Sequence, residues 1–292
     1  MHVALVEERS TTATSRMACR RRLGHLGWRA AAEALAGVLV LTAVAEVLLR
    51  ALDVSEFLVP MPSAVAHSLY ENRALLATHS LVTLREVVIG FGAAAAGGFA
   101  LAVLMFYVPF LARALYPVLI ASQTIPKIAL APLLVVWFGF GLAPKVIVVF
   151  LMAFFPVVIA TAVGLRSVDE NMVHLVRSMG ASEWQTFWKV RLPRAVPSIY
   201  SGLKIAITLS VVGAIVGEFV GADAGLGYLL LIANGQLDTP LMFAAVLLLS
   251  VMGLTLFGAV AVLERVTPGH IRDLTEGSDG LAAMSPTYRS PG

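Results

Sequence analysis

Residues 87–112 read VVIGFGAAAAGGFALAVLMFYVPFLA, a run of 26 residues without a charged side chain. A helix needs about 20 predominantly apolar residues to cross the hydrocarbon core of a bilayer. The run is therefore predicted to be a membrane span. Small residues recur four apart within it, at Gly92/Ala96, Ala93/Gly97 and Ala94/Gly98. This spacing lets a second helix backbone approach closely in lipid.

The rest of the chain has the same apolar character. Of its 292 residues, 59% are AVILMFWYC and only 13% are charged, and the mean hydropathy is +0.86. A soluble domain carries about 25% charged residues. The composition argues against a soluble enzyme, a disordered protein or nucleic acid as a partner, and indicates a polytopic membrane protein. A single cysteine, Cys19, leaves no internal disulfide and no cysteine-based metal site.

The predicted fold class is an all-α membrane protein with six transmembrane helices. The expected spans cover residues 30–49, 87–112, 114–138, 145–165, 202–222 and 240–263. They form one membrane domain over residues 30–267, between a basic tail at 1–29 and a Gly-, Pro- and Ser-rich tail at 268–292.

The distribution of basic residues predicts the orientation. If the six spans are correct, 16 of the 21 Lys and Arg residues fall in both tails and in the links after the second and fourth spans. Only Arg50, Arg73 and Lys145 fall on the other side. Basic residues concentrate on the cytoplasmic side of a membrane protein. Both termini are therefore expected in the cytoplasm.

The cytoplasmic link over residues 166–200 reads as two short helices around a glycine. Ser167 with Glu170, and Ser182 with Gln185, each fit a capping box at a helix start. Gly180 fits the left-handed position that ends the first helix.

The second short helix of the link carries an aromatic face. Trp184, Phe187 and Trp188 are spaced i, i+3 and i+4, so they are expected on one side of the helix. Pro193 is expected to end that helix. Such a face suits a soluble partner, and it equally suits the headgroup region of the membrane.

The link resembles the cytoplasmic loop of ATP-binding cassette importer permeases. That loop is written E-A-A, three residues, Gly, nine residues, Ile, any residue, Leu-Pro. Gly180 and Leu192-Pro193 stand at the matching spacing, with Val190 in place of the isoleucine. The E-A-A positions hold His174-Leu175-Val176 instead, so no contact of the motif's glutamate is carried over.

Other segments are similar to the branch of that family that imports nitrate, sulfonates, taurine or thiamine precursors. They are Pro60–Ser63, Thr124–Gly139, Gly217-Glu218-Phe219 and Gly225–Tyr228. With the cytoplasmic link, the resemblance covers about residues 55–265.

The resemblance implies a type I (MetI-like) importer permease fold in the plasma (inner) membrane. The implied partners are a separate ATPase subunit, an extracytoplasmic solute-binding protein and a second copy of the chain, in contact with membrane lipid. The implied ATPase-docking residues are Arg177, Gly180, Ala181, Ser182, Trp184, Leu192 and Pro193. The chain has no G-x-x-x-x-G-K-[ST] phosphate loop, so ATP hydrolysis is assigned to the partner and no cofactor is expected.

Ionisable residues inside spans usually face protein or water. Gln123, Thr124 and Lys127 are candidates for lining the translocation path, where Lys127 suits an anionic solute. Alternatively, Lys127 extends to the headgroups. Glu218 near the outer end of the fifth span is a candidate gate, or it forms an ion pair with Arg85 or Lys127.

The predicted function is the permease subunit of an ATP-driven importer for a small organic or inorganic anion, such as a sulfonate, taurine or nitrate. A secondary transporter coupled to an ion gradient through Glu218 and Lys127 is the alternative, but it gives the capped link no role. A membrane hydrolase using Ser80 and His79 is a further alternative. The sequence lacks H-E-x-x-H and G-x-S-x-G, and no catalytic or metal-binding residues are predicted.

Overall fold

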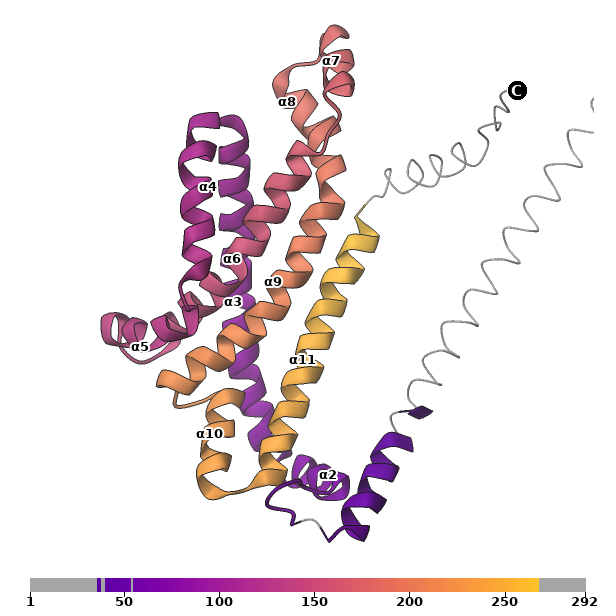
Figure 1. Cartoon of the computed structure of the whole chain (residues 1–292), viewed down its shortest axis with the longest axis vertical. Coiled ribbons are helices and arrows are strands. Elements are labelled where there is room, and N and C mark those ends of the chain that lie inside the picture. Colours follow the sequence, from indigo (N-terminus) through magenta and orange to yellow (C-terminus); the bar gives the residue numbers. More distant parts are fainter. Residues whose placement is uncertain (1–35, 38–39, 54, 268–292) are drawn as a thin grey trace, which may run out of the picture.

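The structure is a computed structural model that describes residues 36–37, 40–53 and 55–267. Within these residues all regular structure is helical, which confirms the predicted all-α class (Figure 1). The tails at 1–29 and 268–292 lie outside the described residues, as does part of the first expected span. The described part of that span is helical over residues 40–51.

The helices follow one another in a simple order. They are α2 (Pro62–Glu71), α3 (Arg73–Tyr107), α4 (Pro109–Thr124), α5 (Lys127–Phe138), α6 (Leu142–Arg166), α7 (Glu170–Ser178), α8 (Glu183–Thr186), the π-helix η1 (Phe187–Arg191), α9 (Leu192–Gly221), α10 (Leu226–Gln236) and α11 (Thr239–Val266).

Four of the described helices are long and apolar enough to cross a membrane: α3, α6, the continuous helix from Glu183 to Gly221, and α11. The expected third span corresponds to two helices, α4 and α5, with a bend of 94° between them. The described residues hold a fifth span only if this pair is counted as one broken span. The described residues therefore account for four or five of the six expected spans.

The predicted bounds of the second span are wrong. The helix begins at Arg73 and ends at Tyr107, and Pro109 already starts α4. The predicted span was an uncharged run that began at Val87, but the preceding Glu86 is buried and belongs to the helix interior. A paired buried charge does not interrupt a membrane helix.

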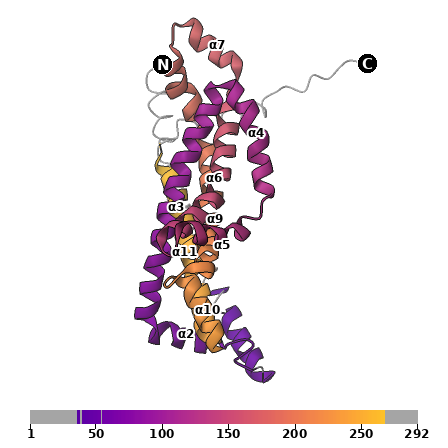
Figure 2. The ribbon, with the colours of Figure 1, turned by 90° about the vertical axis from the view of Figure 1, so that its left-hand side faces the viewer.

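α6 lies at the centre of the bundle, between α3 and α9 (Figure 2). Gly90 and Gly98 of α3 face it so closely that an added Cβ would lie 2.5 Å and 3.0 Å from Val149 and Val157. The predicted small-residue spacing thus serves helix packing at Ala94 and Gly98. At Gly92 the space is open, so the pair Gly92/Ala96 is not at this contact.

The bundle is elongated, with different elements at its two ends (Figures 1 and 2). α7 and α8 lie at one end, which is called the α7–α8 end below. α2 and α10 lie at the opposite end, called the α10 end. α11 finishes at the α7–α8 end, where the hydroxyl groups of Tyr200 and Thr267 are 2.6 Å apart.

Candidate functional site

The turn between α7 and α8 has the predicted geometry. Gly180 has φ +87°, in the left-handed region that favours glycine. Ser182 and Gln185 form the predicted capping box: Gln185 N–H donates to the Ser182 hydroxyl at 3.2 Å, and Ser182 N–H donates to the Gln185 side chain at 3.0 Å. An ion pair between Arg177 and Glu183 spans the turn.

The predicted capping box at the start of α7 is wrong. The cap is Asp169, whose carboxylate accepts the N–H of Asn171 at 2.9 Å. The Ser167 hydroxyl instead donates to the carbonyl of Gly164 at 2.8 Å, and so belongs to the end of α6. Asp caps a helix N-terminus as well as Ser does. Because Asp169 directly precedes Glu170, the helix begins at Glu170.

The aromatic face of the link is divided between two environments. Phe187 is 4% exposed and packs in a cluster with Val103 and Leu165, at the ends of α3 and α6. Trp184 and Trp188 are 69% and 48% exposed, and their rings are in edge contact. Phe187 therefore anchors the link to the bundle, and both tryptophan rings stay exposed on the surface of the link.

Further exposed apolar side chains lie on α7, at the same tip. The set of Leu175, Met179, Trp184 and Trp188 is called the tip surface below. Of the predicted docking residues, Arg177, Gly180, Ser182 and Trp184 are exposed, whereas Ala181, Leu192 and Pro193 are half-buried.

The predicted helix end at Pro193 is wrong. η1 forms a wide turn in which Leu192 N–H bonds to Phe187 O, five residues back, and the chain continues directly into α9. A π-type turn accommodates the proline, whose ring would clash with the carbonyl four residues back in a regular α-helix. One helix of 39 residues thus runs from Glu183 to Gly221.

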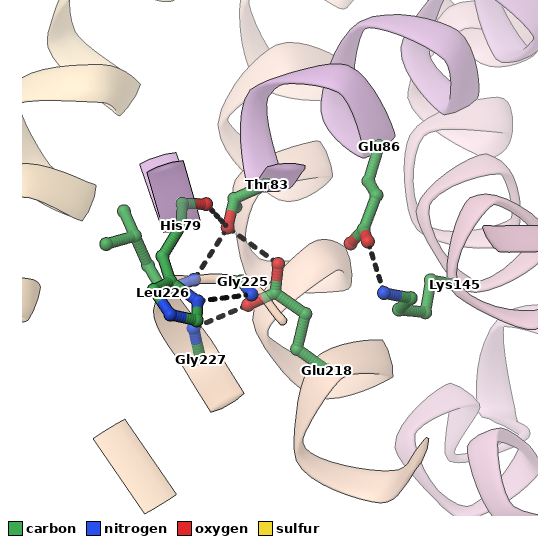
Figure 3. Close-up of polar contacts among 8 residues, drawn as sticks. All are labelled: His79, Thr83, Glu86, Lys145, Glu218, Gly225, Leu226 and Gly227. Carbon is green, nitrogen blue, oxygen red and sulfur yellow. Dashed lines mark hydrogen bonds and ion pairs between the residues drawn. The ribbon is translucent and has the colours of Figure 1, made fainter. Parts of the chain in front are cut away.

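At the α10 end, side chains from α3 and α9 cap the first turn of α10 (Figure 3). Gly225 N–H donates to His79 Nδ1 at 2.9 Å, and Leu226 N–H donates to Thr83 Oγ1 at 2.8 Å. The next amide, that of Gly227, donates to a carboxylate oxygen of Glu218 at 2.5 Å. The first amides of a helix have no partner within it, so these side chains satisfy three donors at once.

Glu218 is 1% exposed and also accepts the Thr83 hydroxyl at 2.6 Å. A Cβ added to Gly225 would lie 2.2 Å from this carboxyl group. The predicted ion pair of Glu218 with Arg85 or Lys127 is wrong, because amide and hydroxyl donors take its oxygens.

A buried ion pair lies beside this network (Figure 3). Lys145 Nζ is 2.5 Å from Glu86 Oε1, and the two side chains are 5% and 0% exposed. The carboxyl groups of Glu86 and Glu218 are also close enough for the charge of one to act on the other. Lys145 was counted among the basic residues at the outer ends of the spans, but it is buried inside the bundle. This ion pair was hard to predict from the sequence, because Glu86 is 59 positions away from Lys145 and lies on another helix.

The break between α4 and α5 carries the predicted path residues. Gln123 and Thr124 are exposed at the end of α4, and Lys127 is half-buried at the start of α5. Lys127 Nζ lies 4.8 Å from the centre of the Phe155 ring. Within the described residues no carboxylate lies at ion-pair distance from Lys127.

The geometry gives no support to the hydrolase alternative. His79 uses Nδ1 to accept Gly225 N–H and stacks on Tyr228, with ring centres 6.0 Å apart. Among the described residues, no hydrogen bond joins His79 to Ser80.

A family model described as "Binding-protein-dependent transport system inner membrane component" matches residues 88–267. The chain is 40% identical over 211 residues to the formylaminopyrimidine transport permease protein ThiX of Halalkalibacterium halodurans, covering 72% of this chain and 84% of that protein. It is 39% identical to the riboflavin transport system permease protein RibX of Chloroflexus aurantiacus, over 72% of this chain and 79% of that protein.

A more distant relative is the taurine transport system permease protein TauC of Escherichia coli, at 30% identity over 68% of this chain and 72% of that protein. Among solved structures, a chain of the inward-facing MetNI methionine ABC transporter superposes with a TM-score of 0.60. Its identity is 21%, over 67% of this chain and 97% of that chain. This likeness establishes the fold.

Proposed function

Because this chain belongs to the family of binding-protein-dependent transport system inner membrane components, the permeases of ATP-binding cassette importers, we propose that its tip surface is where the ATPase docks. A permease of this family is an inner-membrane transport protein and not an enzyme, and it works with a separate ATPase and a substrate-binding protein. The docking role falls to Arg177, Gly180, Ala181, Ser182, Trp184, Leu192 and Pro193, with Met179 and Trp188 added from the geometry.

The observation that carries this proposal is the exposed tip surface on an anchored, continuous helix. Large exposed apolar patches on a water-facing part of a protein mark interaction sites. Phe187 fixes the tip to the bundle, and the helix from Glu183 to Gly221 connects the tip to Glu218 at the far end. A displacement of the tip would therefore be transmitted to the α10 cap along one continuous helix.

The α7–α8 end is proposed to face the cytoplasm, with both termini on that side. Basic residues support this orientation because they gather at that end. Those among the described residues are Arg113, Arg166, Arg177, Lys189, Arg191, Arg194, Lys204 and Arg265.

The translocation path is proposed to lie between two copies of the chain, beside the break between α4 and α5. Non-helical backbone at membrane depth is tolerated only where protein covers it or it lines a water-filled cavity. Gln123, Thr124 and Lys127 at the break are the proposed lining residues, and Glu218 is proposed to act through the α10 cap.

The proposed solute is a small organic molecule. The relatives at 39–40% identity are named for formylaminopyrimidine and riboflavin, and the relative at 30% for taurine. A heteroaromatic compound is the first candidate on that ranking. A small solute with an anionic group, namely taurine, another sulfonate or the inorganic anion nitrate, is the second candidate, because Lys127 brings to the break a positive charge that has no carboxylate partner among the described residues.

The test is ATP hydrolysis and solute uptake in proteoliposomes that contain the permease, its ATPase and its binding protein. In Trp184→Ala the ATPase is expected to copurify poorly, and hydrolysis stimulated by loaded binding protein should be lost. The matched control is Leu254→Ala, because Leu254 is 72% exposed on α11 and away from the tip. Wild-type coupling in the Trp184→Ala complex would contradict the docking assignment.

A further inference from the structure

Two cavities adjoin between α4 and α6 at the α7–α8 end. The larger has a volume of about 350 Å³ and is lined by Pro109, Ala112, Arg113, Tyr116, Pro117 and Arg166. The smaller has a volume of about 90 Å³ and is lined by Tyr116, Arg166 and seven apolar residues of α3, α4 and α6. The cavities share Tyr116 and Arg166, so together they form one groove, called the α4–α6 groove below.

The mouth of the groove carries two free positive charges. The side chains of Arg113 and Arg166 are exposed, and within the described residues neither guanidinium forms an ion pair, a hydrogen bond or a ring contact. The next acidic side chain along the chain, Asp169, is committed to the cap of α7. Two guanidinium groups that line the same cavity without a carboxylate partner suit a phosphate group, which arginine binds through paired N–H donors.

Below the arginines the groove is apolar. Met105, Leu119 and Val158 form its buried wall. Its rim is also apolar, since Ile120 and Val163 are 50% and 58% exposed. A dissolved inorganic anion makes no favourable contact with such a wall, whereas an acyl chain packs against it through the van der Waals contacts that hold membrane helices together. A ligand with a charged head and an apolar tail matches both parts of the groove.

We propose that the α4–α6 groove binds one anionic phospholipid of the cytoplasmic leaflet, with its phosphate between Arg113 and Arg166 and one acyl chain along α4 and α6. Tyr116, which lines both cavities, lies where the headgroup meets the chain. The inference rests on the orientation proposed above, because anionic lipids are enriched in the cytoplasmic leaflet. Basic pockets between membrane helices on that side bind anionic headgroups.

The bound lipid would position α4. This helix is the stem of the broken pair, and Pro117 interrupts its backbone hydrogen bonding. A lipid that contacts both walls of the groove fixes α4 against α6, and thereby fixes the break that begins at Thr124. The lipid is therefore expected to affect uptake through helix position and not through contact with solute.

The test is native mass spectrometry of the intact transporter released from nanodiscs of equal parts phosphatidylglycerol and phosphatidylcholine. Wild type is expected to retain phosphatidylglycerol in preference. Arg113→Gln/Arg166→Gln should reduce that retention about a hundred-fold or more, since each of the two lost charge-assisted contacts is worth about ten-fold or more in affinity. The control is Arg194→Gln/Arg265→Gln, which removes two exposed charges at the same end but outside the groove and should leave retention unchanged.

Equal retention by the groove variant and the control would overturn the proposal. Selective binding of inorganic phosphate or of the transported solute at the arginines, without lipid, would overturn it too and would make the groove part of the path. Lipid retention needs no turnover. A transporter that retains the lipid at the arginines but shows no coupled ATP hydrolysis would refute the proposed function and leave the lipid site standing.

Discussion

At the scale of single residues, Glu218 shows how a membrane protein buries a carboxylate without giving it a lysine or arginine of its own. Its oxygens accept the Thr83 hydroxyl and the Gly227 amide, and it faces the N-terminus of α10. The amides at a helix N-terminus carry partial positive charge, which favours an anion there. The nearby cation, Lys145, is paired with Glu86.

Gly225→Ala is expected to destabilise the protein by about 2 kcal/mol or more, through backbone strain and a clash. Gly225 has φ +126°, and the added Cβ would lie 2.2 Å from the Glu218 carboxyl group. In Gly235→Ala, which lies within α10, the added Cβ has no atom within 4 Å. This variant should be neutral or stabilising by up to about 1 kcal/mol. Thermal unfolding in detergent measures the stability of both variants. Equal unfolding midpoints for the two would show that the α10 cap does not require glycine at position 225.

Glu86→Gln is expected to cost about 3–5 kcal/mol, because it leaves the Lys145 ammonium buried without its counter-charge. Glu86→Gln/Lys145→Met should recover most of that loss, since an apolar side chain of similar volume replaces the charge. The exposed pair His67–Glu71 supplies the control: Glu71→Gln should change stability by less than about 1 kcal/mol. A double variant as unstable as Glu86→Gln would contradict this account.

At the scale of elements, the continuous helix from α8 to α9 connects the two regions described above. The π-turn of η1 lets the helix pass Pro193 without a break. The turn at Gly180 sets the angle between α7 and α8, and Phe187 sets where that pair rests on the bundle. Trp184 and Trp188 of the tip and Glu218 of the α10 cap therefore belong to one continuous helix, although they lie at opposite ends of the molecule.

Substitutions at Gly180 should separate backbone geometry from side-chain contact. Its φ of +87° is tolerated by Asn and disfavoured for a β-branched residue, and an added Cβ meets nothing within 4 Å. Gly180→Asn is therefore expected to keep ATPase coupling, while Gly180→Val loses it with insertion unchanged. The measurement is hydrolysis stimulated by loaded binding protein. Equal coupling in both variants would argue against a role for the left-handed turn.

At the scale of the whole molecule, the broken pair α4–α5 leaves the described fold incomplete as a membrane structure. α5 projects beside the bundle at mid-height (Figure 1). Ala131 and Leu134 pack against α6, but other apolar side chains of α5 are exposed, with Val136 79% and Trp137 68% exposed. The helix ends at the 94° bend need protein or a water-filled cavity around them. The second copy of the chain proposed above would meet that requirement.

Trp137→Cys is expected to form a cross-linked dimer in membranes on mild oxidation, if α5 faces its counterpart across the two-fold axis. Cys19→Ser removes the only natural cysteine and provides the background. Leu254→Cys, on an exposed face of α11, should stay monomeric on denaturing gels. Dimers of the Leu254 variant alone would place the contact on α11.

Apolar run lengths determined the class and the rough position of the spans, because a bilayer requires about 20 apolar residues from any crossing helix. The left-handed turn at Gly180 and the Ser182 capping box were also predictable, since both arise from contacts within a few residues. Family membership followed from the same local motifs, namely Gly180, Leu192-Pro193 and the segments around Lys127 and Glu218.

Only the tertiary structure decided the partners of the buried charges and the course of the helices past their prolines. Lys145 stands at the start of a predicted span, where its charge could face water, yet it is buried and pairs with Glu86 from another helix. Likewise, the contacts of Glu218 and His79 join α9 and α3 to α10. Local sequence encodes propensity and hydropathy, whereas these pairings depend on which helices meet and at what depth. That geometry is fixed by close contacts such as those of Gly90 and Gly98 with α6.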